Sequence, residues 1–148
     1  MRVRSIFALF CALALMACSA PSDGRQRTQD AWARVVGRVD AGPLGSQAAL
    51  QTPDSVSAGV PFTITVSTYG STGCIHPDRS DIQQEQSSVD VTAYDSLWVG
   101  SPACLPDWHP YPRALELRFG LAGPAFIRLH GRGADSALTF ERAIIVRP

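Results

Sequence analysis

Two cysteines in the middle of the chain are each followed closely by a histidine, and these four residues are the first candidates for chemistry. His76 lies just after Cys74, and His109 lies a few positions after Cys104. Two thiolates and two imidazoles form a ligand set that Zn²⁺ accepts in tetrahedral sites. Structural zinc sites usually show closely spaced Cys and His pairs, which this arrangement lacks. A zinc or copper site at His76 and His109 therefore stays an alternative, and we expect no metal.

Three acids gather after the first of these cysteines, at Asp78, Asp81 and Glu85. Calcium prefers several carboxylate and carbonyl oxygens, so such a cluster has the right donor chemistry. The same residues are also typical of a solvated loop with turn-forming acids. We expect the loop. The remaining histidine, His130, lies near the end of an expected strand, where a surface position is the simplest interpretation.

Aromatic side chains in a proline-rich segment are the best candidates for binding. Trp108, His109 and Tyr111 lie among prolines that stiffen the chain. Such rings can stack on sugar faces or anchor a protein partner at small entropic cost. Alternatively, they cover an open end of the domain or pack on a disulfide. Trp98 is flanked by aliphatic residues, and we expect it in the core.

The sequence carries no recognisable catalytic motif. The sequence contains no nucleophile elbow, phosphate loop, dinucleotide fingerprint, zincin helix or EF-hand loop. It also contains no lysine, so no Schiff base or phosphate-clamping lysine is available. We therefore expect no catalytic residues, no cofactor and no enzymatic activity.

The amino-terminal segment has the features of an export signal. Arg2 and Arg4 precede an apolar run from Ile6 to Met16, which is too short to span a bilayer as a helix. The run ends in Leu15–Cys18, which resembles the lipobox of bacterial lipoproteins. The resemblance implies removal of residues 1–17 and acylation of Cys18. Two or three acyl chains would anchor the protein durably, since each buried methylene contributes about 0.8 kcal/mol.

Ordinary secretory cleavage is the competing interpretation, and its sites fit less well. Cleavage after Ala20 would leave Pro21 at the new amino terminus, and cleavage after Ala17 would put the bulky Leu15 at the minus-three position. We therefore expect a signal peptide at 1–17, a lipidated tether at 18–31 and one domain at 32–148. Ser19 after the acylated cysteine is compatible with sorting to the outer membrane, so the expected location is the bacterial cell envelope.

The charge of the mature chain gives no sign of a nucleic-acid partner. Without residues 1–17, eleven basic and thirteen acidic residues remain, a formal charge of −2 (11 − 13). Nucleic-acid binding needs a basic patch, which this balance does not favour. The expected partners are the lipid bilayer, through acylated Cys18, and an envelope protein or glycan.

Cysteine usage predicts one disulfide. Cys11 leaves with the signal and Cys18 is acylated, so Cys74 and Cys104 remain as the only pair. Two cysteines in an exported protein most simply form a bridge. Closing a loop of roughly 30 residues would stabilise the fold by about 3–4 kcal/mol on the loop-entropy model.

Downstream of the tether the chain breaks into short apolar or alternating runs separated by turn residues, which predicts strands. The strongest is Phe62–Tyr69, whose alternation places Phe62, Ile64, Val66 and Thr68 on one face. The other expected strands are Arg34–Val39, Ala48–Thr52, Val89–Tyr94, Ala114–Phe119, Ala125–Gly131 and Leu138–Val146. A turn is expected at Gly42–Gly45 and an exposed loop at His76–Ser87, while Pro102–Pro112 is too rich in proline for a central strand.

About seven short strands without a helical pattern predict an all-β, antiparallel two-sheet sandwich with one disulfide. The stretches Ser57–Phe62, Gly123–Gly131 and Phe140–Val146 are similar in order to those of bacterial immunoglobulin-like domains. The resemblance implies an immunoglobulin-like architecture, although the cysteine placement differs from that of antibodies. Because this architecture hosts many unrelated functions, it supplies none by itself. We expect a non-enzymatic interaction or structural module, with a carbohydrate-binding or peptidoglycan-binding module as the alternative. An exposed edge strand could also pair with another chain, but the sequence does not identify which.

Overall fold

The computed structural model describes residues 31–40, 49–100, 104 and 107–148, and these residues form nine strands and no helix. The strands are β1 (Trp32–Val36), β2 (Leu50–Gln51), β3 (Ser55–Ser57), β4 (Phe62–Gly70), β5 (Ile75–Gln84), β6 (Ser88–Trp98), β7 (His109–Leu117), β8 (Gly123–Arg132) and β9 (Ala137–Arg147). The expected signal peptide, Cys18 and the turn at Gly42–Gly45 lie outside the described residues.

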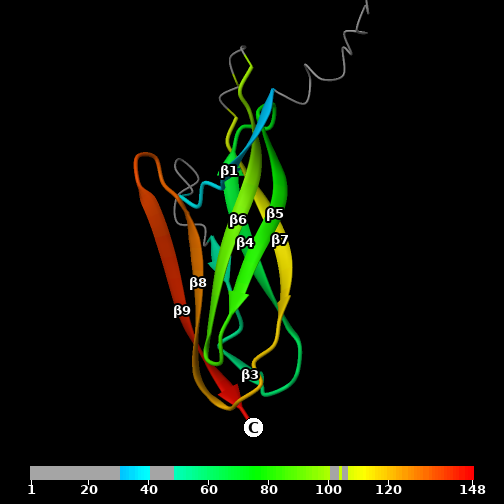
Figure 1. Cartoon of the computed structure of the whole chain (residues 1–148), viewed down its shortest axis with the longest axis vertical. Helices are drawn as coiled ribbons and strands as arrows, with labels where there is room; N and C mark the ends of the chain where they lie inside the picture. The colour runs from blue at the N-terminus through cyan, green and yellow to red at the C-terminus, as the bar shows by residue number, and fades with distance from the viewer. Residues whose placement is uncertain (1–30, 41–48, 101–103, 105–106) are drawn as a thin grey trace, which may run out of the picture.

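The strands build two sheets that pack face to face (Figure 1). The smaller sheet has the order β2-β4-β7, and the larger has the order β1-β6-β8-β9-β3 with β5 also paired to β6. β5 runs along one side of β6, while β1 and β8 pair with its second and first halves, respectively. The buried core draws on both sheets, with Ile64 and Val66 from β4, Val89 and Val91 from β6, Ile127 and Leu129 from β8, and Ile144 and Val146 from β9.

The prediction of an all-β fold is confirmed, but the expectation of purely antiparallel pairing is wrong for two strand pairs. β6 pairs with β8 in parallel, and β3 pairs with β9 in parallel. Between β6 and β8 the chain passes through β7 in the other sheet. It therefore crosses the sandwich twice and enters β8 in the same direction as β6.

The expectation of an exposed loop at His76–Ser87 is also wrong, because most of this segment is β5. The strand pairs antiparallel with β6 over nearly its whole length, with a register shift between Pro77 and Ser80. β5 lies at a sheet edge and most of its side chains are exposed. A strand with so little buried surface does not need the apolar alternation that marks a strand in the sequence.

Several local predictions are confirmed. β4 covers the predicted strand Phe62–Tyr69, and its inward residues Ile64, Val66 and Thr68 are buried. The proline-rich segment is not a central strand, because β7 carries Pro110 and Pro112 at the edge of the smaller sheet. Proline is tolerated there because an edge strand leaves one row of backbone groups unpaired.

Candidate functional site

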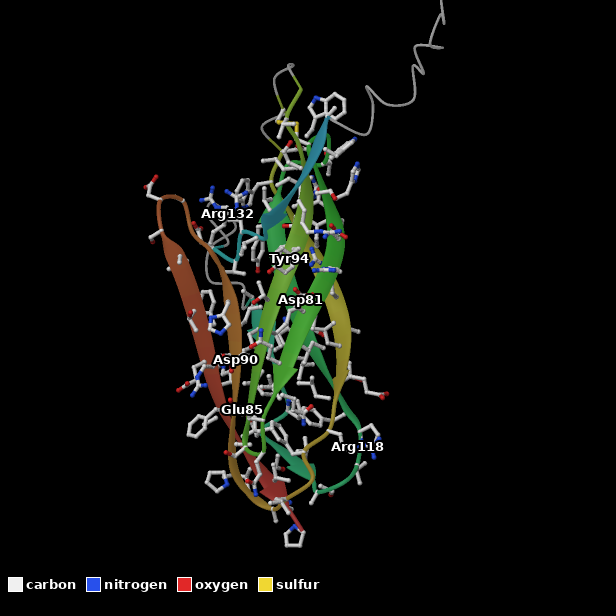
Figure 2. All side chains as sticks on the ribbon, in the orientation of Figure 1. Asp81, Glu85, Asp90, Tyr94, Arg118 and Arg132 are labelled. Atoms are coloured by element: carbon white, nitrogen blue, oxygen red, sulfur yellow. A yellow bond between two sulfur atoms is a disulfide. The ribbon has the colours of Figure 1, made fainter. Side chains whose placement is uncertain are left out.

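One end of the sandwich carries the start of β1 and the end of β6 (Figure 1), together with the disulfide (Figure 2). Cys74 lies in the turn between β4 and β5, and Cys104 precedes β7. Their Cα atoms are 5.7 Å apart and their sulfurs are bonded, which confirms the predicted disulfide. A bridged pair offers no thiolate, so the alternative of two cysteine ligands to a zinc ion is removed.

A second tie between the same two segments is polar. The Asp107 carboxylate accepts hydrogen bonds from the Ser71 hydroxyl at 2.9 Å, from the Thr72 backbone N–H at 3.3 Å and from the Thr72 hydroxyl. These bonds favour the charged form and hold the pKa of Asp107 below its usual range, with the Thr72 hydroxyl as the largest cause. The segment before β7 is thus attached to the β4–β5 turn by a covalent bond and by a hydrogen-bonded carboxylate.

Three aromatic rings meet on the outer face of the larger sheet at this end. Trp32 opens β1 and stands directly opposite Trp98, the last residue of β6. Their ring centroids are 5.2 Å apart in an edge-to-face arrangement. The His76 ring, from β5, lies 4.6 Å from the ring of Trp32 on a centroid basis. We call Trp32, His76 and Trp98 the aromatic surface.

The expectation that Trp98 lies in the core is wrong. The two tryptophans of the aromatic surface are half-buried, His76 is exposed, and none of the three belongs to the core cluster. Along β6 the inward positions are those of Val89, Val91 and Ala93, so Trp98 has the opposite parity and faces outward. The aliphatic neighbours of Trp98 in the sequence therefore misled the prediction.

Charged groups of both signs on β1 and β5 continue this face beside β6. Arg34 Nε donates to Asp78 Oδ2 at 2.6 Å, which lowers the pKa of Asp78. Arg79 pairs with Asp81 at 3.2 Å, and its guanidinium lies 5.9 Å from the centroid of the Tyr94 ring. Figure 2 shows Asp81 of β5 and Tyr94 of β6 close together. Because the charges occur as pairs, the face next to the aromatic surface has little net charge.

The residues predicted to form a binding surface are placed differently from one another. Trp108 is half-buried and packs against the core, and the Arg38 guanidinium lies 4.6 Å from the centroid of its ring. His109 is exposed, with Nε2 3.5 Å from Asp107 Oδ2. Tyr111 points into the space between the sheets, where burial raises the pKa of its phenol. Only His109 of the three is well exposed.

Sequence reasoning missed a polar cluster between the sheets. Asp95 of β6 is 1% exposed and pairs with Arg113 of β7, whose side chain is 11% exposed. Thr68 of β4 donates to Asp95 at 2.9 Å and accepts from Arg113 at 3.0 Å. The signal was present in the sequence, because Asp95 continues the inward parity of Val89 and Val91.

This polar cluster is not fully hydrogen-bonded. Asp95 Oδ2, Arg113 Nε and Nη1 and the Tyr111 hydroxyl are buried and have no hydrogen-bond partner among the described residues. Burial raises the pKa of Asp95, while Arg113 and Thr68 act in the opposite direction. The approach of Gly37 is so close that a Cβ there would lie 2.9 Å from Asp95 Oδ2. The bonds of the cluster link β4, β6 and β7, and Gly37 packs directly against it.

The acids proposed as a calcium alternative are engaged elsewhere. Asp78 and Asp81 form the ion pairs with arginine described above, and Glu85 accepts from the Ser88 hydroxyl at 3.2 Å. Across the described residues, no group of three or more His, Cys, Asp or Glu side chains is placed to hold a metal ion.

His130 is a connecting residue on the outer face of the larger sheet. Its Nε2 lies 2.6 Å from Asp90 Oδ1, and its Nδ1 lies 3.1 Å from Thr139 Oγ1. Asp90 lies in β6, His130 in β8 and Thr139 in β9. The chain of hydrogen bonds therefore links three adjacent strands.

Comparisons of this chain with family models, with curated proteins and with solved structures find no match. In the part of the chain that the structure describes, no helix is long and apolar enough to cross a membrane.

Proposed function

We propose that this chain is a non-enzymatic binding module, anchored in the bacterial cell envelope by acylated Cys18, that contacts its partner through the aromatic surface. The lipobox resemblance of Leu15–Cys18 supports the anchor. The contact between the Trp32, His76 and Trp98 rings on an outer sheet face carries the proposal for the binding surface.

Tryptophans that cluster on the outside of a sandwich do not contribute to its core, which favours a role in binding. Large aromatic side chains bury much area with little loss of conformational freedom, and they dominate the energy of many binding interfaces. Here the rings hold one another in place before a ligand arrives. Trp32 also follows the tether directly, and residues 19–31 span at most roughly 45 Å when fully extended. The aromatic surface therefore stays close to the membrane.

Glycan is the ligand class that the neighbouring charges favour. Sugar rings stack on aromatic faces, and their hydroxyl groups exchange hydrogen bonds with carboxylates and guanidinium groups. The aromatic surface adjoins the Arg34–Asp78 and Arg79–Asp81 pairs, whose charges offset each other. A neutral, hydroxyl-rich partner such as the glycan strands of peptidoglycan suits this balance better than a strongly charged polymer.

An immunoglobulin-like identity of the domain belongs to the same proposal. Two face-to-face sheets and the disulfide support it, while the parallel β6–β8 pairing departs from the antiparallel pattern of such domains. The proposed function does not depend on this identity, because a sandwich of this kind can carry many functions.

The anchor is tested by the mass and location of the protein expressed in a bacterial envelope. The wild type is expected in the membrane fraction, with a mass gain matching two or three acyl chains. The Cys18→Ser variant is expected to lack both properties. An unmodified wild-type amino end would reject the anchor and leave the binding surface as a separate question.

The binding surface is tested by co-sedimentation with purified peptidoglycan sacculi. Trp32→Ala and Trp98→Ala should each weaken binding about tenfold or more, the effect of losing an anchoring aromatic group. Phe126→Ala is the matched control, because Phe126 is an exposed aromatic residue on the same sheet. Equal binding by all variants would reject the aromatic surface as the binding site, and no binding by the wild type would reject glycan as the ligand.

A further inference from the structure

Among the described residues, one long edge of the larger sheet has no strand paired to most of its length. β3 pairs only with the last residues of β9, from Ile145 to Arg147. The preceding stretch, 137–144, pairs with β8 on one side and has no strand partner among the described residues on the other. Figure 1 shows β9 as the outermost strand on this side of the molecule.

The backbone of β9 presents hydrogen-bonding groups along this edge. The N–H of Ile145 donates outward to the carbonyl of Asp54 at 3.1 Å. Backbone groups point to alternate sides along a strand. The N–H and C=O groups of Thr139, Glu141 and Ala143 therefore face the same open edge.

Other edges of the two sheets are protected in ways that β9 is not. β5 carries Pro77 and a register shift, and β7 carries Pro110 and Pro112. β1, β2 and β3 have five, two and three residues. β9 has eleven residues, no proline and no register shift against β8, and the charged side chains of its open stretch are Glu141 and Arg142. Native proteins usually block exposed edges, so a long edge without proline, bulge or covering strand indicates a surface that pairs with another strand.

We infer that this edge pairs antiparallel with β9 of a second copy of the chain, around a two-fold axis at Phe140. A two-fold axis that joins two edges into one sheet sets one residue opposite its own copy. Phe140 and Glu141 lie in the middle of the open stretch 137–144, so one of them is the residue on the axis. Two glutamates opposite each other repel, whereas two aromatic rings attract. Phe140 is 40% exposed and available for the contact.

The neighbouring residues fit the same register. Thr139 then stands opposite Glu141 of the second copy, and Leu138 stands opposite Arg142, so no like charges meet. The paired stretch runs from residue 137 to residue 143 and ends before β3 begins to occupy the edge at Ile145. The pairing uses neither Cys18 nor the aromatic surface, so it is independent of the proposed function.

Cysteine cross-linking tests the register directly. Residues that face each other across a non-hydrogen-bonded pair have Cα atoms about 4.5 Å apart, within the range of a disulfide. Under mild oxidation Phe140→Cys should form covalent dimers several times faster than Phe126→Cys, a matched change at an exposed phenylalanine of β8. Arg142→Cys should also be slow, because its copy lies opposite residue 138.

Two cross-linking results would overturn the inference. One is a Phe140→Cys dimer that forms no faster than the two control dimers, and the other is preferential cross-linking of Phe140→Cys to a different protein. Sedimentation of the protein without added cysteines gives a second measurement. The wild type should show concentration-dependent dimers, which Phe140→Arg lowers and Phe126→Arg leaves in place. A wild type that stays monomeric at every concentration would also contradict the pairing.

Discussion

The space between the two sheets has two halves that are held together by different physical means. Along β6 the inward residues change from Val89 and Val91, through Ala93, to Asp95. The first half is filled by apolar side chains, most of them aliphatic, and we call it the aliphatic half. The second half contains the Asp95–Arg113 pair and Thr68, and it lies toward the disulfide end.

The two halves differ in how far the contribution of one side chain to the stability of the fold depends on its neighbours. Aliphatic packing contributes free energy roughly in proportion to the area buried, and each side chain contributes independently to a first approximation. A buried ion pair contributes little net stability, but removing one member leaves an uncompensated charge. Small truncations in the aliphatic half should therefore lower the free energy of unfolding only slightly. Removal of any one member of the polar cluster should lower it strongly.

The largest effect is expected from removal of the buried carboxylate. Asp95→Ala leaves Arg113 buried without a counter-charge and should lower the free energy of unfolding by about 3–5 kcal/mol. Urea unfolding measures the change. Asp90→Ala on the same strand is the control, because Asp90 is partly exposed and should cost far less. If the two variants lost similar amounts of unfolding free energy, the stability of the polar half would not depend on the pairing of Asp95 with Arg113.

Loss of the disulfide should come next. Replacing Cys74 and Cys104 together by serine should lower the free energy of unfolding by about 3–4 kcal/mol, since the unfolded chain regains the freedom of the closed loop. Thermal and urea unfolding both report this value. If the two substitutions cost nothing, the bridge would not be what holds the segment before β7 in place.

Near-isosteric substitutions sharpen the comparison between the halves. Thr68→Val removes the hydroxyl that serves both Asp95 and Arg113 and should cost about 1–3 kcal/mol. Ile127→Val in the aliphatic half removes one methylene and should cost about 0.5–1.5 kcal/mol. Unfolding in urea separates the two, and a Thr68→Val variant as stable as the wild type would contradict the role of the hydroxyl.

The smallest effect is expected in acid and has opposite signs in two carboxylates. The pKa of Asp107 is lowered, so its contribution to stability is present above the unfolded pKa, near 3.9, and is lost as pH falls through the folded pKa. The pKa of Asp95 is raised by burial, so protonation of this residue favours the native state as pH falls. Carboxyl titration by NMR should find Asp107 below and Asp95 above that reference value. The reverse order would refute both assignments.

Local patterns predicted the parts of the fold that local physics decides. The alternation of Phe62–Tyr69 was sufficient to place β4, and cysteine usage was sufficient to pair Cys74 with Cys104. β5 was missed because an edge strand can be polar on both faces. The parallel β6–β8 pairing was missed because it depends on which sheet β7 joins, and no stretch of sequence encodes that choice locally.

The candidate site was harder to predict than the fold. Trp32 and Trp98 are far apart in the sequence and become neighbours only through the β1–β6 register. The neighbouring prolines suggested a binding role for Trp108, yet its ring packs against the core and beneath the Arg38 guanidinium. Counting inward and outward positions along β6 would have placed both Asp95 and Trp98 correctly, because strand parity assigns them to opposite faces.

The most direct test of the proposed binding surface is an NMR titration of the indole N–H signals. The chain has three tryptophans, so isotope-labelled protein gives one signal for each. On addition of solubilised peptidoglycan glycan strands, the Trp32 and Trp98 signals should shift in a saturable manner while the Trp108 signal stays in place. No shift at any concentration, or a shift of Trp108 alone, would contradict binding at the aromatic surface.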